Sequence, residues 1–149
     1  MKVPVTFALL LIIALSTSGW AGFRQRPVTY LSALDALVRE DFAAAEAAFS
    51  VLITQSPGEP DIWQAFAASL DGQDRREEAA DAYRRAVESY CERIQDRPED
   101  ANAHANLVIC LLCSAHREEA SAALAEGLRL NPNDSSLLGL KGAFNPEGR

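Results

Sequence analysis

Cys110, Cys113 and His116 are the residues whose types and spacing come closest to a metal or cofactor site. Covalent haem attachment needs a histidine directly after the second cysteine, and here two other residues intervene. A zinc site needs about four ligands in a tetrahedral array, and the other histidine, His104, lies too far along the chain. A thioredoxin-like redox pair would need a βαβ setting, which the sequence lacks. We therefore expect no metal and no cofactor, with Cys110 and Cys113 as small core residues of a helix.

The remaining polar residues form no recognisable set of nucleophile, base and acid. The sequence has two histidines, and its eight glycines are scattered rather than gathered in a phosphate-binding loop. The pairs Glu77-Glu78 and Glu118-Glu119 begin helix-like runs, where carboxylates complement the helix dipole. That role is sufficient, so the pairs need not be catalytic. The sequence predicts a protein that is not an enzyme.

These glutamates belong to a repeated pattern. The sequence Arg-Glu-Glu-Ala at positions 76–79 recurs letter for letter at positions 117–120, and each copy opens a helix-like run closed off by proline. Internal self-similarity of this kind indicates an array of repeated helix pairs. Function should then lie in a surface that the array builds rather than in a catalytic pocket.

Length and composition agree with an all-α fold. The 149 residues suffice for one domain, and the alanine-rich chain has few aromatic residues and few β-branched runs, which favours helix throughout. The net charge is −7, and it becomes −8 without residues 1–21, whose only charged side chain is Lys2. Because no basic stripe could neutralise phosphates, we expect no nucleic-acid partner. Anionic membrane surfaces would also repel most of the domain.

Residues 1–22 differ from the rest of the chain. A short positive start precedes a wholly apolar run from Phe7 to Leu15, and small residues precede a candidate cleavage site after Ala21. These are the parts of a secretory signal peptide. The alternative is an uncleaved membrane anchor, since residues 3–23 are mostly apolar and just long enough to span a bilayer of roughly 30 Å. In either case we expect the helical array to lie outside the cytoplasm.

The spacing of large and small residues resembles the tetratricopeptide repeat (TPR), a helix–turn–helix unit of about 34 residues. Three units are recognisable, at residues 26–59, 60–100 and 101–134. The residues that carry the match are Ala45, Phe49, Leu52 and Pro57, then Trp63, Phe66, Ala67, Leu70, Ala79, Tyr83 and Ala86, then His104, Leu107, Val108, Leu111, Ala120, Leu124, Gly127 and Pro132. The resemblance implies an all-α solenoid of about three helical hairpins, in which alanines let neighbouring helices approach closely.

The first unit departs from the repeat in its first helix. The positions that should hold large residues are Thr29, Ser32 and Ala36. A shift by one residue gives the better set Tyr30, Ala33, Leu34 and Leu37. We therefore expect the turn between its two helices to be one residue short.

The second unit carries an insertion. Pro60 and Ala101 occupy equivalent positions but are 41 residues apart, seven more than the repeat length. We expect its second helix to continue to about Arg97, roughly 10 Å further than usual. Tyr90 and Ile94 continue the apolar stripe along this extension. Two interpretations stay open: the two residues pack on the start of the next helix, or they form a protruding contact ridge for a partner.

Residues 135–149 begin a fourth unit that stops early. Ser135 and Ser136 are candidate N-caps of a short helix. Gly139 and Gly142 weaken that helix, since glycine in a helix interior costs about 1 kcal/mol. We expect a short capping helix followed by a tail.

The resemblance places the cysteines in neighbouring units. One disulfide could join Cys91 to Cys110 or Cys113 across the second and third units. Cys110 and Cys113 themselves lie on adjacent turns of one helix, where the required geometry is rarely met. An odd thiol would remain.

In TPR proteins, peptide ligands usually lie in a concave groove formed by the first helices of the hairpins. The resemblance assigns to this groove Leu31, Gln64, Ala68, Ala105, Ile109 and Leu112, together with Asp35, Val38 and Asp71. None of these is the lysine or asparagine with which some family members clamp a C-terminal carboxylate, so that activity is not expected. A narrow, partly apolar and slightly acidic groove would suit an apolar or basic segment of a protein partner.

The leading hypothesis is therefore a non-enzymatic adaptor in a bacterial periplasm, free or tethered to the inner membrane. It would bind a protein partner during assembly of an envelope or membrane complex. This role is implied by the resemblance to periplasmic proteins of the family and not by particular residues. The alternative is a stoichiometric accessory subunit, held in a membrane complex by an uncleaved N-terminal transmembrane helix.

Overall fold

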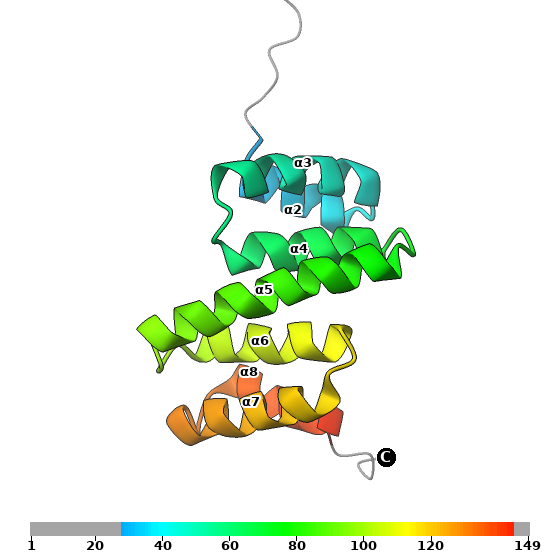
Figure 1. The fold of residues 1–149 in the computed structure, drawn as a ribbon. Helices are drawn as coiled ribbons and strands as arrows, with labels where there is room; N and C mark the ends of the chain where they lie inside the picture. The colour runs from blue at the N-terminus through cyan, green and yellow to red at the C-terminus, as the bar shows by residue number, and fades with distance from the viewer. Residues whose placement is uncertain (1–27, 145–149) are drawn as a thin grey trace, which may run out of the picture.

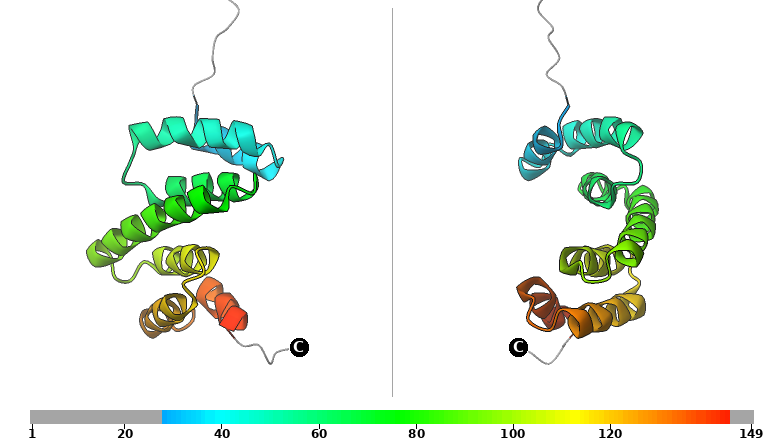
Figure 2. Two further views of the ribbon diagram at one scale, coloured as in Figure 1. Left: turned by 45° about the vertical axis from the view of Figure 1, so that its right-hand side comes forward. Right: turned by 90° about the vertical axis from the view of Figure 1, so that its left-hand side faces the viewer.

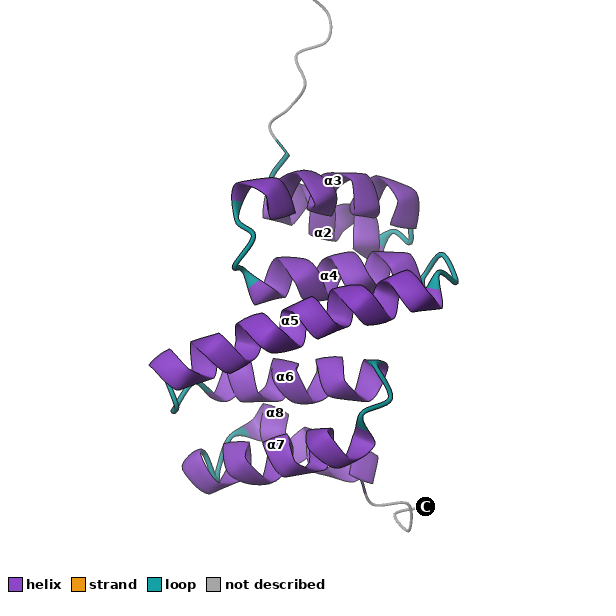
Figure 3. Ribbon diagram, viewed as in Figure 1, coloured by secondary structure: helices purple, strands orange, loops and turns teal. Residues whose placement is uncertain are grey.

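The structure is a computed structural model that describes residues 28–144. The expected N-terminal signal peptide or anchor, with its apolar helix, lies outside the described residues. The described chain is helical and contains no strand, and its helices are joined by short loops (Figures 1 and 3). In chain order the elements are α2 (Tyr30–Val38), α3 (Phe42–Gln55), α4 (Pro60–Asp71), α5 (Arg76–Asp96), α6 (Ala101–Cys113), α7 (Arg117–Leu130), α8 (Ser135–Leu140) and the 3-10 helix η1 (Lys141–Phe144).

The helices form three stacked antiparallel hairpins, α2–α3, α4–α5 and α6–α7, followed by α8. The right-hand view of Figure 2 shows the first helix of each hairpin on one side of the stack and the second helix on the other. Each hairpin also packs on the next, through α3 against α4 and α5 against α6. This arrangement buries apolar faces that no single hairpin could bury alone.

Each hairpin turns through the same backbone motif. The second residue before the second helix has a positive φ, and it is Glu40, Asp74 or Ala115. In each turn the next residue donates its N–H to the carbonyl five residues earlier, in the pairs Asp41 to Ala36, Arg75 to Leu70 and His116 to Leu111. This is the Schellman arrangement, which satisfies carbonyl groups at a helix end.

The shared turn shows that the expected shorter turn in the first hairpin is wrong. In every hairpin a fully buried residue lies seven positions before the residue of positive φ, and these residues are Ala33, Ala67 and Val108. The first unit therefore keeps the register of the other two. The one buried residue of its first helix is Ala33, and Leu34 and Leu37 are only partly buried beside it. Close packing of helices depends on small side chains at the contact. The position of Ala33 therefore indicates how this helix aligns with the repeat, whereas the positions of Leu34 and Leu37 do not.

The second helix of the middle hairpin is longer than its counterparts. Helix α5 has 21 residues, whereas α3 and α7 each have 14. It ends at Asp96 and is capped by Arg97, so the predicted extension is confirmed. In all three cases the second residue after the helix is a proline, at positions 57, 98 and 132. Proline disfavours helical geometry in the residue before it, which accounts for the common ending.

The alanines that the sequence placed at the helix contacts are buried. Ala67, Ala79 and Ala120 are at most 2% exposed, and Tyr83 and Leu124 pack beside them in the same core. This core extends from α4 to α8, and a smaller core joins α2 and α3 to α4. Alternating small and large side chains give the high density that protein interiors need.

Helix α8 covers the end of the array. Its Leu137 is fully buried against α6 and α7, as expected for a capping helix. The N-cap is Asp134 rather than Ser135 or Ser136, since the Asp134 carboxylate accepts hydrogen bonds from two N–H groups of the first turn. A carboxylate also complements the positive end of the helix dipole. Arg117 of α7 fixes the following 3-10 helix by donating a 2.9 Å bond to the carbonyl of Ala143.

Candidate protein-binding surfaces

The predicted concave-groove residues differ in accessibility. Leu31 is 76% exposed on α2, and Ala105 is 5% exposed and lies in the core. The prediction that Ala105 contacts a ligand is therefore wrong, because a buried methyl group cannot reach a ligand. Seven predicted positions remain. Four are half-buried on α4 and α6, namely Gln64, Ala68, Ile109 and Leu112, and three are exposed on α2 and α4, namely Asp35, Val38 and Asp71.

Tyr90 does not form part of a protruding contact ridge. Its side chain is fully buried in the main core, and its hydroxyl oxygen lies 2.6 Å from Oδ1 of Asp61 and 2.7 Å from Oε1 of Gln64. The phenol has one proton, which it donates to the carboxylate; Gln64 can complete the contact with its amide nitrogen turned toward the phenol. Burial and the bond to Asp61 raise the pKa of Tyr90. Ile94 is half-buried against the same core, so neither side chain protrudes.

The α5 extension takes part in a polar cluster centred on Asp61. Arg93 of α5 binds Oδ2 of Asp61 at 3.1 Å and Glu59 at 2.9 Å. Asn106 of α6 lies 3.5 Å from Oδ1 of Asp61. Tyr90 and Arg93 both lie in the last seven residues of α5, beyond the length of the other second helices. The extension is therefore fastened to the start of α4. The sequence pattern does not reveal this role, because the partners are about thirty residues apart.

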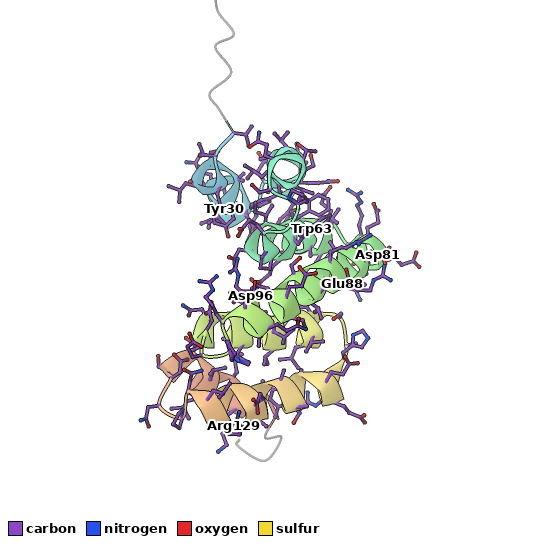
Figure 4. All side chains as sticks on the ribbon, turned by 60° about the vertical axis from the view of Figure 1, so that its left-hand side comes forward. Tyr30, Trp63, Asp81, Glu88, Asp96 and Arg129 are labelled. Carbon is purple, nitrogen blue, oxygen red and sulfur yellow. The ribbon has the colours of Figure 1, made fainter. Side chains whose placement is uncertain are left out.

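A second surface, here called the Trp63 groove, runs along α5 and is defined by Trp63, Phe66, Arg85, Glu88 and Glu92. Cavities of about 320 Å³ and 440 Å³ share Trp63 and Arg85 in their walls. A third cavity of about 200 Å³ shares Glu92 with the second. The shared residues place the three cavities side by side along α5. Figure 4 shows Trp63 beside α5, with Glu88 further along that helix.

Two aromatic rings form the floor of the Trp63 groove. The rings of Trp63 and Phe66 meet edge to face, with their centroids 6.1 Å apart. The indole Nε1 of Trp63 donates a 2.7 Å hydrogen bond to the carbonyl oxygen of Pro57, which fixes the ring. Both side chains remain half-buried. Fixed, partly exposed aromatic rings are typical anchor points of protein interfaces.

The three cysteines are free thiols in the structure. Cys110 is buried, and burial with the neighbouring Cys113 raises its pKa to about 12. Cys113 is exposed, and it lies close enough to Tyr83 to raise the pKa of that phenol further, after burial. Cys91 is half-buried. The disulfide between Cys91 and either of the other two stays a prediction.

The described part of the chain offers no metal site. No group of three or more histidine, cysteine, aspartate and glutamate side chains within residues 28–144 could hold a metal ion. None of the helices in this range combines the length and the apolar character needed to cross a membrane.

No protein-family model and no curated protein sequence matches the chain. A solved structure of the CopN–Scc3 complex contains a similar chain, with a TM-score of 0.51 and 23% identity over 76% of this chain and 63% of that chain. This chain has a TPR-like fold. The MamA AMB-1 structure is also similar, with a TM-score of 0.45 and 18% identity over 72% of this chain and 55% of that one. The chain thus spans less than two thirds of either TPR-like neighbour.

Proposed function

We propose that this protein is a non-enzymatic scaffold that binds a protein partner outside the cytoplasm. The observation that carries the proposal is the TPR-like array itself, which builds extended surfaces from stacked hairpins. The acidic balance of the chain favours a basic or apolar protein segment over nucleic acid.

The place and process are part of the proposal. The apolar N-terminal segment supports export, and we propose the bacterial periplasm as the site, with the array free or tethered to the inner membrane. Assembly of an envelope or membrane complex is the process we propose, because a stacked array offers extended surface that suits bringing other proteins together.

A specific observation favours the alternative of an accessory subunit held by an uncleaved N-terminal helix. Leu31 and Val38 of α2 are 76% and 81% exposed, and Val28, two residues before this helix, is also exposed. Exposed apolar residues next to a membrane anchor are suited to contact with another subunit of a membrane complex.

Co-purification from the native membrane tests the proposed function. The tagged full chain should retain one protein partner in fixed stoichiometry, and Ala79→Trp, which overpacks the array, should lose it. Intact mass then bears on the two roles, because loss of residues 1–21 excludes the subunit held by an uncleaved helix, whereas their retention fits that subunit or a tethered adaptor. A chain that retains no protein under these conditions would contradict both.

A further inference from the structure

The Trp63 groove exposes an aromatic ring at a position that is buried in the next unit. His104 occupies the equivalent position in the third hairpin, and its Nε2 lies 2.9 Å from the carbonyl oxygen of Pro98, just as the indole nitrogen of Trp63 contacts Pro57. His104 is only 3% exposed, however, whereas Trp63 remains half-buried in the wall of two cavities. The shared hydrogen bond is thus structural, and the open aromatic floor is individual to the second hairpin.

The charges along the groove change from paired to unpaired. Near the aromatic floor, Arg84 binds Asp81 at 2.7 Å and Arg85 lies 3.6 Å from Glu88. Further along α5, Glu92 has no ion-pair partner among the described residues. The groove therefore has a nearly neutral aromatic half and a half that carries unpaired negative charge.

In the acidic half, three carboxylates and two guanidinium groups line the cavity of about 200 Å³. Glu92 and Asp96 lack ion-pair partners within residues 28–144, while the third carboxylate, Glu59, is bound to Arg93, which also binds Asp61. Arg97 remains as the one unpaired cation lining this described cavity. The cavity keeps an excess of negative charge, which a basic side chain would complement.

We propose that the Trp63 groove binds an extended segment of the partner protein, with an apolar or aromatic side chain over Trp63 and Phe66 and basic side chains opposite Glu92 and Asp96. This inference rests on the proposed scaffold function. From Ala82 to Asp96 the groove follows about four turns of α5, or roughly 21 Å. An extended segment of about seven residues spans that distance, and its alternating side chains suit successive cavities.

Photocrosslinking in the native host tests this assignment with the full chain. A photoreactive phenylalanine replaces Ser89, which lines both cavities at the acidic end, or Ile109 on the first-helix side, or exposed Ala122 on α7. We expect position 89 to crosslink to a segment that contains an apolar residue followed or preceded by lysine or arginine, and position 122 to give no crosslink.

Two matched pairs of variants, each made in the chain with the crosslinker at position 89, separate the groove from the rest of the surface. Glu92→Lys should lower the crosslink yield about tenfold, whereas Glu118→Lys, the same change at an exposed site on α7, should leave it unchanged. Gly58→Trp should block the groove, because Gly58 lines two of its cavities and has open space around it. Gly139→Trp is the matched control, since it also meets no neighbouring atom.

The outcomes separate this inference from the proposed function. A crosslink from position 109 but not from position 89 would overturn the groove assignment and leave the scaffold function intact. A crosslinked segment without basic residues, or a yield that Glu92→Lys does not change, would also overturn the assignment. No crosslink from any of the three positions would contradict the scaffold function as well.

Discussion

Tyr90 and Asp61, which are 29 residues apart in the sequence, are joined by a 2.6 Å hydrogen bond between α5 and α4. Tyr90 begins the seven-residue extension of α5, so the insertion lengthens a helix and at the same time fastens it to the start of its partner helix. Arg93 binds the other carboxylate oxygen of Asp61 one turn later. The insertion is therefore part of the fold of the second hairpin rather than a separate projection.

Replacing Tyr90 by phenylalanine tests this connection. The change leaves the ring in the core but removes the donor to Asp61, so we expect a loss of about 1–2 kcal/mol in the free energy of unfolding. Tyr30→Phe is the matched control, because Tyr30 is partly exposed and packs edge to face on Phe49 without a hydroxyl contact in the described structure. Urea unfolding measures both variants. Equal stability of Tyr90→Phe and the wild type would show that the hydrogen bond contributes nothing.

The raised pKa of Tyr90 predicts that the stability of the fold depends on pH in the alkaline range. Burial and Asp61 raise the pKa of Tyr90 above its ordinary value of 10.0. Above pH 10 the unfolded chain therefore releases this proton while the folded chain keeps it, and the free energy of unfolding falls as pH rises. Tyr90→Phe should fall less steeply than the wild type between about pH 10 and 11. Parallel curves would argue against a raised pKa in the folded state.

The cysteines should react in an order set by their burial. Cys113 is exposed, Cys91 is half-buried, and Cys110 is buried with a pKa raised to about 12. Because the thiolate is the reactive form, native protein at about pH 8 should be alkylated first at Cys113 and last at Cys110. Peptide mass spectrometry after timed alkylation gives the order. Denatured, unreduced protein should show three reactive thiols, and a single one would establish the disulfide instead.

Gly72 should be intolerant of a side chain although it lies at a surface turn. A Cβ atom at this position would lie 2.5 Å from ring carbons of Phe42, which packs over the turn from α3. Gly72→Ala should therefore destabilise the array by about 1–3 kcal/mol, as overpacking does. Gly58→Ala is the control and should be neutral, since no atom lies within 4 Å. Recovery of stability on combining Gly72→Ala with Phe42→Leu would identify the ring as the cause, and no recovery would exclude it.

The hairpins are predictable from the sequence because their signals are local. Repeated small residues such as Ala79 and Ala120 indicate how the helices stack, and the break in the repeat period indicates the length of α5. The register of α2 is not predictable in the same way. Its decisive residue is Ala33, and a small side chain at a close contact resembles any other alanine in the sequence.

The candidate sites are less predictable because they depend on contacts between distant residues. The apolar stripe through Tyr90 and Ile94 is evident in the sequence, but a stripe does not say which helix covers it. The bond from Arg93 to Asp61 joins positions 32 apart, and no motif signals it. The exposure of Trp63 likewise depends on how neighbouring helices pack, which the repeat pattern alone does not specify.

Tryptophan fluorescence tests the central claim, that this scaffold binds its partner in the Trp63 groove, most directly. Trp20→Phe leaves Trp63 as the only tryptophan of the chain. On titration with the segment identified by crosslinking, its emission should shift to shorter wavelength and saturate at one equivalent. The midpoint should rise about tenfold in Glu92→Lys and stay unchanged in Glu118→Lys. Unchanged Trp63 emission, while calorimetry shows that the segment binds, would contradict the account.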